Sequence, residues 1–442
     1  MRKTDIRYQT YLKILEEELL PAMGCTEPIA VAYAAAMARD LLGSMPVRME
    51  VNVSGNILKN VKSVVVPNTG GLRGIQAAAA AGAAVGQAER ELEVIAQVTS
   101  EQVGEIRTFL ERCPIQVGLA ATSQIFYIEV LAFGGDGSSS EAAISGFHTN
   151  VIRKRKNGQT LLQREEAAER ESPCDEKSLL SIEGALEFAD TVELDDVRAL
   201  VQRQIDYNYA IAQEGLWGNY GANIGSVLLK HDGDDVKVRA KAYAAAGCEA
   251  RMSGVNRPAM SCANKGNVGI AASMPIVVQA RELGLGDEAM QRGIALSYCL
   301  AIAIIHRIGK DPSMCSCEVA AAIGVAAGTV LLHGGTQQQV ENAIQNTIPN
   351  IFGVVCDGAK LACALRISSG TGIGIEAANL ALAGVRLANN QGVLAANADE
   401  SINMIGHTAL YAMVDSDREL SRQIFAKRKP FPLMRFEDRQ KQ

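Results

Sequence analysis

The sequence predicts an α+β protein in which a mainly helical catalytic bundle carries an inserted α+β module. Nearly half of the 442 residues are hydrophobic, aromatic residues are few, and alanine and glycine are abundant. This composition suits close-packed helices better than a sandwich or a barrel. Short strand patterns are confined to residues 45–165, whereas helical periodicity dominates after residue 178. A chain of this length exceeds one ordinary core, so more than one domain is expected.

The N-terminal region is expected to form two helices. Apolar residues recur at helical spacing over residues 8–20, and Pro21 ends the run. After the segment MGCTEP, a second and almost apolar helix extends to Gly43. We expect these two helices, which make up residues 1–44, to pack on the C-terminal bundle.

Residues 45–165 are expected to form the α+β module. Helical patterns cover residues 74–86 and about 99–112. The dipeptide Asn157-Gly158 lies between two strand patterns and is typical of a hairpin turn. The remaining strand candidates are VRMEVNVSG, SVVVPN, LEVIAQVT, IQVGLA and FYIEVLAF.

Residues 166–442 are expected to form an all-helical catalytic domain. The charged segment at residues 163–178 suits a linker or an exposed helix. Several connections between the later helices are richer in glycine than a turn requires, and such loops can expose backbone N–H groups to a ligand. These connections are GLWGNYGANIG, MSGVNRPAMSCANKGNVGIAASMP and RISSGTGIGIEAA.

The charge and the apolar segments of the chain indicate a cytoplasmic protein. A net charge of −6 provides no electrostatic footprint for nucleic acid or an anionic membrane. The amphipathic N-terminus does not resemble a signal peptide. The most apolar stretch, residues 293–305, is shorter than the roughly 18–20 residues of a membrane span. We therefore expect no nucleic-acid or membrane partner, whereas the sequence does not distinguish a monomer from a homo-oligomer.

The loop SCANKGNVG is the strongest candidate for binding a small ligand. It places Asn264, Lys265 and Asn267 beside small residues, just before an apolar helical pattern. A carboxylate can bind to backbone N–H groups at such a helix N-terminus. We expect these three residues, together with Arg366, to hold the carboxylate and amino groups of an amino-acid substrate.

Four of the ten cysteines are grouped in the last third of the chain: Cys315, Cys317, Cys356 and Cys363. Their spacing fits neither the paired knuckles of a zinc site nor a Cys-x-x-Cys redox pair. An iron–sulfur cluster tolerates such spacing, and a cubane with three cysteine ligands leaves one iron open as a Lewis acid. From spacing alone, buried thiols without a metal remain an equal alternative.

The segment from CSCEVAAAIG to CDGAKLACALRISSG resembles the cluster-binding region of iron–sulfur L-serine dehydratases. A closer resemblance, carried by GCTEP, VPNTGGLRGI, SCANKGNVGIAASMP and CDGAKLACALR, is to the L-cysteine desulfidase family, which is related to those dehydratases. The similarity extends over residues 10–415. The dehydratases have Cys-Asp-Pro where this chain has Cys-Asp-Gly, which favours the desulfidase branch.

This resemblance implies a [4Fe-4S] cluster held by Cys315, Cys356 and Cys363. It also implies that Cys25 of GCTEP is the catalytic proton acceptor. Cys25 directly precedes a predicted helix N-terminus, where the helix dipole favours a thiolate. Cys317 lies two residues from Cys315 and competes with it as the third ligand.

The expected function is β-elimination of L-cysteine to hydrogen sulfide, ammonia and pyruvate. The first alternative is an L-serine dehydratase with the same cluster. A second is a pyridoxal-phosphate lyase, with Lys265 as Schiff base and SSGTGIG at residues 368–374 as phosphate loop, although this loop lacks the Walker signature. A third alternative is a non-catalytic protein that binds a small molecule.

Overall fold

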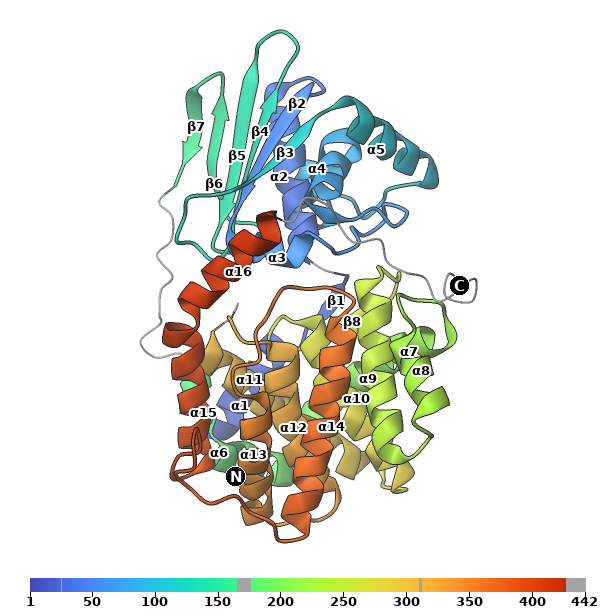
Figure 1. Ribbon diagram of the computed structural model, residues 1–442, viewed down its shortest axis with the longest axis vertical. Helices are drawn as coiled ribbons and strands as arrows, with labels where there is room; N and C mark the ends of the chain where they lie inside the picture. The colour runs from blue at the N-terminus through green and yellow to red at the C-terminus, as the bar shows by residue number, and fades with distance from the viewer. Residues whose placement is uncertain (25, 165–175, 310–311, 427–442) are drawn as a thin grey trace.

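The computed structural model describes residues 1–24, 26–164, 176–309 and 312–426. A helical bundle forms one half of the molecule and a module with a six-stranded sheet forms the other (Figure 1). Each half has its own large hydrophobic core. The predicted fold class, a mainly helical α+β protein with an inserted α+β module, is confirmed.

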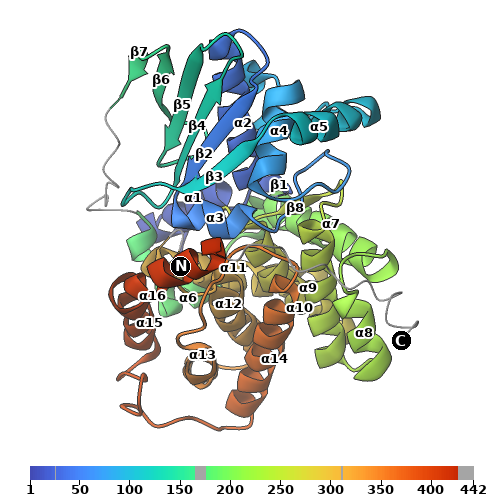
Figure 2. The ribbon, with the colours of Figure 1, turned by 45° about the horizontal axis from the view of Figure 1, so that its top comes forward.

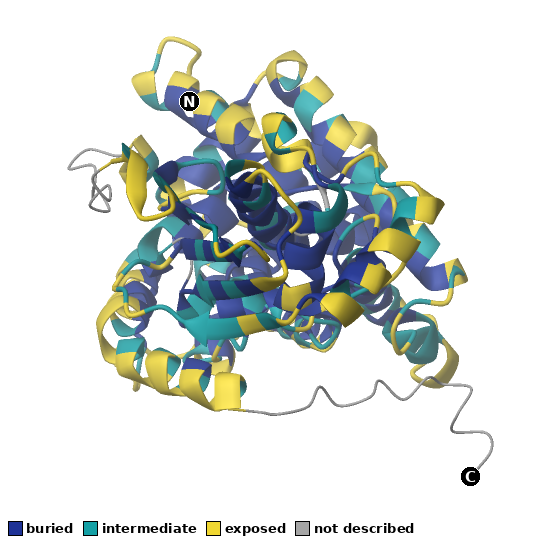
Figure 3. Ribbon diagram, turned by 90° about the horizontal axis from the view of Figure 1, so that it is seen from above, coloured by how far each residue is buried: buried dark blue, intermediate teal, exposed yellow. Residues whose placement is uncertain are grey.

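The bundle is built around buried, alanine-rich helices. Helix α12 is central, because it packs against α10, α11, α13 and α14. Viewed from above, buried residues gather inside the molecule and exposed residues lie on the outer surfaces (Figure 3). The helices of this half are α1 (Ile6–Glu18), α6 (Ile182–Thr191), α7 (Leu194–Trp217), α8 (Ile224–His231), α9 (Val236–Met252), α10 (Gly266–Glu282), α11 (Asp287–Ile308), α12 (Ser316–Leu332), α13 (Gln337–Ile351), α14 (Cys363–Leu382) and α15 (Ala398–His407).

The module contains a mixed sheet with the strand order β3-β2-β4-β5-β6-β7, in which only β2 and β3 are parallel. The β6–β7 hairpin turns at Asn157 and Gly158, both at positive φ, as predicted. The helices and strands of the module are α2 (Thr26–Leu42), β2 (Arg48–Val53), α3 (Gly55–Val61), α4 (Gly74–Val85), α5 (Ser100–Arg112), β3 (Ile115–Leu119), β4 (Tyr127–Phe133), β5 (Ser139–Ser145), β6 (Val151–Lys156) and β7 (Gln159–Gln163).

Helix α2 differs from the expected packing of the N-terminal region. Helix α1 contributes to the core of the bundle, but α2 packs on strands β4 and β5 and against helix α4. The sheet and α4 cover the middle of α2, so every residue from 28 to 38 is buried. The boundaries 1–44, 45–165 and 166–442 stay a prediction.

Two of the strand candidates are wrong. The segment LEVIAQVT, residues 92–99, begins within a short 3₁₀ helix, η1 (Ala88–Glu93), and contains no strand. Within this segment the adjacent residues Val94 and Ile95 are both buried, whereas adjacent residues of a strand point to opposite faces. The segment SVVVPN makes only an isolated bridge, between Val65 and Arg73.

The segment RISSGTGIGIEAA is not a connection, because it lies inside α14. A side chain at Gly374 would overlap the backbone of Ala322 in α12, so the glycine allows these two helices to pack closely. The backbone N–H groups of a helix interior are used by the helix itself. The predicted phosphate loop at residues 368–374 is therefore wrong, and the pyridoxal-phosphate alternative loses its phosphate site.

Helix α11 is the one helix in the described ranges that is long and apolar enough to cross a membrane. However, 83% of its most apolar window is buried inside the structure, where α11 packs against α12 and α10. Helix α11 is therefore a core helix of the bundle.

The two halves meet at helix α3. The last described helix, α16 (Val414–Ala426), follows a short π-helical turn, η3 (Thr408–Ala412), and packs against α3 (Figure 2). The ammonium of Lys59 in α3 is buried and forms an ion pair with Asp417 in α16. Removing either charge would leave the other uncompensated, so this pair ties α16 to the module. A 3₁₀ turn, η2 (Glu176–Leu179), precedes α6.

Candidate active site

The thiol-bearing segments are joined by backbone pairing. Met314 and Val355 form an antiparallel bridge between the residues before α12 and the residues after α13. The N–H of Cys315 donates to the carbonyl of Val354 at 2.8 Å, and the N–H of Cys356 donates to the carbonyl of Ser313 at 2.7 Å. Cys315 and Cys356, 41 positions apart in the sequence, are thus held on two adjacent backbone segments.

Two helix N-termini point their positive ends toward this region. Cys315 is the N-cap residue of α12, and Cys363 is the first residue of α14. The helix dipole stabilises negative charge at both positions. The Sγ atoms of Cys315 and Cys317 are 3.4 Å apart, and both thiols are buried.

The thiols influence one another electrostatically. A hydrogen bond from Cys317 lowers the pKa of Cys363 to about 6, and the ammonium of Lys360 acts in the same direction against burial. Hydrogen bonds to Cys315 and Cys363 raise the pKa of Cys317 well above its usual value. Burial raises the pKa of Cys356 to about 11. The four predicted thiols therefore share one environment, in which Cys356 is half-buried and the other three are buried.

A fifth thiol belongs to the same environment. Cys248 in α9 is fully buried, and burial raises its pKa well above the usual value. The charges of Cys363 and Cys315 act in the same direction, so Cys248 lies close to the group. Cys248 lies 67 positions before Cys315 in the sequence, and no local motif around it signals this position.

Helix α3 of the module forms a wall against the loop between Cys356 and Cys363. Gly358 has a φ of +93°, and a side chain there would overlap the carbonyl of Lys59. The N–H of Ala359 donates to the Oδ1 of Asn60 at 3.2 Å. The loop runs along the bundle beneath α3 (Figure 1). The α+β module therefore contacts the thiol-bearing loop directly.

Arg366 holds this loop against α12. Its Nη2 lies 3.2 Å from Asp357 and its Nη1 lies 3.6 Å from Glu318. Burial lowers the pKa of Arg366, but the charges of Cys315, Asp357 and Glu318 outweigh burial and raise it. The guanidinium thus faces the thiols but is already paired with two carboxylates.

A short ribbon brings the GCTEP and SCANKGNVG segments together. Strands β1 (Pro21–Met23) and β8 (Pro258–Met260) pair antiparallel, and the N–H of Ser261 donates to the carbonyl of Leu20 at 2.8 Å. Gly24, the residue directly after β1, has a φ of +67°. Cys25 itself lies outside the described residues.

The predicted ligand loop is a tight turn followed by α10. The N–H and carbonyl groups of Cys262 and Lys265 bond to each other at 3.2 Å and 3.0 Å. Ala263 and Asn264, the two residues between them, both have left-handed backbone angles, and Asn264 is exposed. Lys265 is the N-cap residue of α10 and is half-buried. The side chain of Lys265 does not cap the first N–H groups of α10.

Arg251 in α9 connects the two segments and was missed by the sequence analysis. Its Nη2 donates to the carbonyl of Gly24 at 2.5 Å, and its Nη1 donates to the Oδ1 of Asn267 at 3.0 Å. Asn267 is buried in the first turn of α10. The charge of Arg251 also acts on the thiol of Cys248, one helical turn away. The predicted residue Asn267 is thereby linked to both the GCTEP segment and the thiol group.

The donor set suits an iron–sulfur cluster better than a single metal ion. Across residues 1–24, 26–164, 176–309 and 312–426, no three Cys, His, Asp or Glu side chains could hold one metal ion. A cubane makes a different demand, because each cysteine sulfur binds a different iron atom. Thiols on three separate segments, of which those of Cys315 and Cys363 are buried and that of Cys356 is half-buried, fit that demand.

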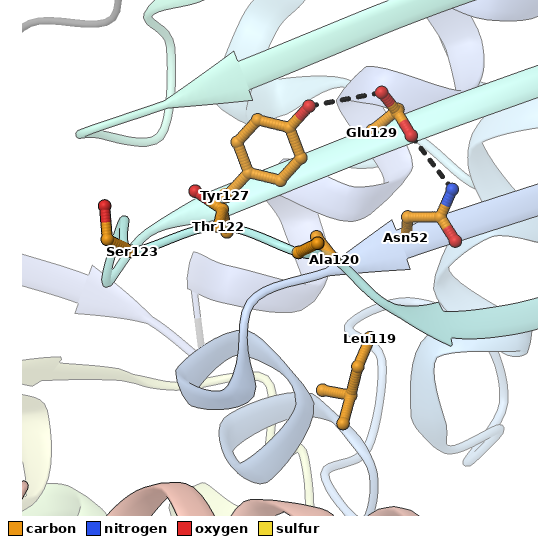
Figure 4. Close-up of a pocket in the computed structure, with 8 residues that line it drawn as sticks. Asn52, Leu119, Ala120, Thr122, Ser123, Tyr127 and Glu129 are labelled. Atoms are coloured by element: carbon orange, nitrogen blue, oxygen red, sulfur yellow. Dashed lines mark hydrogen bonds between the residues drawn. The ribbon is translucent and has the colours of Figure 1, made fainter.

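A separate cavity of about 500 Å³ lies on the sheet of the module. Its lining includes Asn52, Tyr127 and Glu129. These side chains already bond to one another, since Glu129 accepts from Asn52 at 2.9 Å and from Tyr127 at 3.1 Å (Figure 4). No cysteine lines this cavity, so it is not the candidate active site.

The sequence of this chain matches a family model and several known proteins over most of its length. A family model described as "Serine dehydratase alpha chain" matches residues 89–420. A UPF0597 protein of Desulfitobacterium hafniense is 42% identical over 420 residues, which cover 95% of this chain and 97% of the relative. A UPF0597 protein of Fusobacterium nucleatum is 39% identical over 422 residues, covering 94% and 98%. The chain belongs to the UPF0597 family and contains a serine dehydratase alpha chain domain.

The geometry of the thiol-bearing loop predicts a strong effect of Gly358→Ala. Alanine pays about 1–2 kcal/mol for the left-handed backbone, and its Cβ overlaps the carbonyl of Lys59. Gly353→Ala is the matched control, because Gly353 also has a positive φ but has open space around it. In thermal unfolding, Gly358→Ala should lower the midpoint clearly more than Gly353→Ala. Equal shifts would contradict the contact between the loop and α3.

Proposed function

We propose that this protein catalyses an iron–sulfur-dependent β-elimination of L-cysteine. The observation that carries the proposal is the gathering of Cys315, Cys356 and Cys363 at two helix N-termini and one bridged segment. Membership of a family whose model is named for serine dehydratase supports elimination from an amino acid. The protein would therefore be a lyase.

The proposed reaction converts L-cysteine and water to hydrogen sulfide, ammonia and pyruvate. A base removes the α-proton, the bond between Cβ and sulfur breaks with the electron pair leaving on sulfur, and 2-aminoacrylate forms. This enamine tautomerises to the imine, which water hydrolyses to pyruvate and ammonia. No oxidant or reductant is consumed.

Three of the clustered thiols would hold the [4Fe-4S] cluster. Cys356 and Cys363 are proposed as two of the ligands, and Cys315 as the third. When bound, the cluster would supply a Lewis-acidic iron that stabilises negative charge on the substrate. Glu318 keeps the Cys-x-x-Glu spacing to Cys315 and lies within reach of Arg366, so α12 and α14 are tied together next to these thiols.

The remaining predicted residues receive roles that follow from their surroundings. Cys25 is proposed as the base that takes the α-proton, because its neighbour Gly24 is held by Arg251. Asn264, Lys265 and Asn267 are proposed to orient the substrate's amino and carboxylate groups. Arg366 is better suited to positioning the thiol-bearing loop, because two carboxylates already occupy its guanidinium.

L-Serine is the alternative substrate, and the name of the family model favours it. The loop conformation favours L-cysteine. Gly358 has a φ of +93°, which proline cannot adopt because its ring holds φ near −65°. The Cys-Asp-Gly loop of this chain therefore differs in backbone from the Cys-Asp-Pro loop expected of the serine enzymes.

The activity is tested with protein purified without oxygen. Iron and acid-labile sulfide should be found at about four atoms each per chain, and sulfide release from L-cysteine should exceed pyruvate formation from L-serine. The reverse preference would assign the serine reaction. Protein without iron would contradict the cluster and leave only the non-catalytic alternative or a pyridoxal-phosphate enzyme, which hydroxylamine would bleach.

The choice between Cys315 and Cys317 is tested by iron content. Cys315 belongs to the segment bridged to Cys356, whereas Cys317 lies inside the first turn of α12. Cys315→Ser should therefore lose most of its iron, whereas Cys317→Ser should retain it. The opposite pattern would make Cys317 the third ligand.

The role of Cys25 is tested by separating the cluster from turnover. Cys25→Ala should keep the visible absorption of the cluster but lose at least 100-fold in kcat, the lower range for a general base. Cys113→Ala is the control, because Cys113 is buried in the module and should leave both properties unchanged. Full activity of Cys25→Ala would rule out the assigned role.

A further inference from the structure

Arg251 has no negatively charged partner among the residues that the structure describes. Its two described acceptors, the carbonyl of Gly24 and the side-chain oxygen of Asn267, are both neutral. Among the residues that the structure describes, no carboxylate lies within ion-pair distance of Arg251. Its Nε is buried and has no hydrogen-bond partner. A guanidinium in this state retains an unused N–H group and an uncompensated positive charge.

Two other arginines nearby do have counter-ions. Arg366 is paired with Asp357 and Glu318. Arg257, six positions beyond Arg251, is paired with Glu214 at 3.0 Å on the surface. Leaving a partly buried charge unpaired is costly. An anionic ligand would offset this cost for Arg251.

The surroundings of Arg251 favour a carboxylate. A side chain at Gly266 would overlap the Nε of Arg251, so the guanidinium lies directly against the first residue of α10. The side chain of the N-cap residue Lys265 does not cap the N–H groups at that helix N-terminus, and these groups add to the positive potential. A planar guanidinium binds a carboxylate through charge-assisted hydrogen bonds.

The position of Arg251 also fits the proposed reaction. Cys248, one turn earlier in α9, interacts electrostatically with Cys363 and Cys315. Arg251 thus lies between the thiol group and the segment that contains Gly24. A carboxylate held there would place the rest of a small amino acid beside the thiols.

We propose that Arg251 binds the α-carboxylate of the substrate and thereby restricts the protein to amino acids with a free carboxylate. This inference rests on the proposed function for the identity of the substrate. Esters and amides would be rejected, because they cannot neutralise the guanidinium. The two acceptors of Arg251, the carbonyl of Gly24 and the side-chain oxygen of Asn267, carry no charge, so the positive charge remains available for this role.

The test is calorimetric binding of L-alanine, which has the amino and carboxylate groups but no leaving group. The anaerobically purified protein should bind L-alanine more tightly than L-alaninamide. Arg251→Gln should weaken L-alanine binding at least tenfold, the effect of losing a hydrogen bond to a charged group. It should leave the weak binding of L-alaninamide unchanged. Arg257→Gln is the matched control and should bind both compounds like the unaltered protein.

A second variant separates charge from folding. Arg251→Lys keeps the positive charge but loses the planar donor pair. Its affinity for L-alanine should therefore lie between that of the unaltered protein and that of Arg251→Gln. The proposal is overturned if Arg251→Gln binds L-alanine like the unaltered protein, or if the unaltered protein does not prefer L-alanine to L-alaninamide. Because L-alanine cannot be turned over, failure of the proposed elimination would leave this binding result intact.

Discussion

The backbone bridge between Met314 and Val355 is the constraint on which the candidate site depends. It fixes the entry of α12 and the exit of α13, and the chain then needs only a short loop to begin α14. The N-termini of α12 and α14 therefore lie together, and each begins at or beside a cysteine. Because backbone amides and carbonyls make this connection, it does not depend on the side chains that carry the chemistry. The thiols can be altered one at a time without removing the frame.

The module contributes to the same frame through close backbone contact. Gly358 meets the carbonyl of Lys59, and Asn60 accepts a hydrogen bond from the next residue of the loop. Helix α3 is in turn held by α16 through the buried Lys59 and Asp417 pair. A change in α16 would thus reach the thiol-bearing loop through a single short helix. This arrangement gives the α+β module a physical role beside the site, which its sequence pattern alone does not indicate.

The fold class and the group of thiols could be predicted from the sequence, because apolar periodicity and cysteine spacing are local signals. The helical nature of SSGTGIG could not, because glycine favours both loops and close helix packing, and only the contact of Gly374 with α12 decides between them. The secondary structure of LEVIAQVT was equally ambiguous, because the adjacent apolar residues Val94 and Ile95 suit either a strand or a buried turn. Arg251 belongs to no sequence motif, and its contacts with Gly24 and Asn267 appear only in the folded chain, where β1 and β8 pair.

The distribution of charge separates two kinds of cation around the thiols. Lys59, Lys360 and Arg366 each form an ion pair with a carboxylate, and each contacts the thiol-bearing loop or the helix above it. Paired cations of this kind hold backbone in place, because moving them would expose an unpaired charge. Arg251 differs, because its described acceptors are neutral and its Nε is unused. A cation that is not paired with a carboxylate of the protein can bind one from a substrate. The difference in pairing is therefore the physical basis for proposing substrate recognition by α9 and positioning of the thiols by α3 and α14.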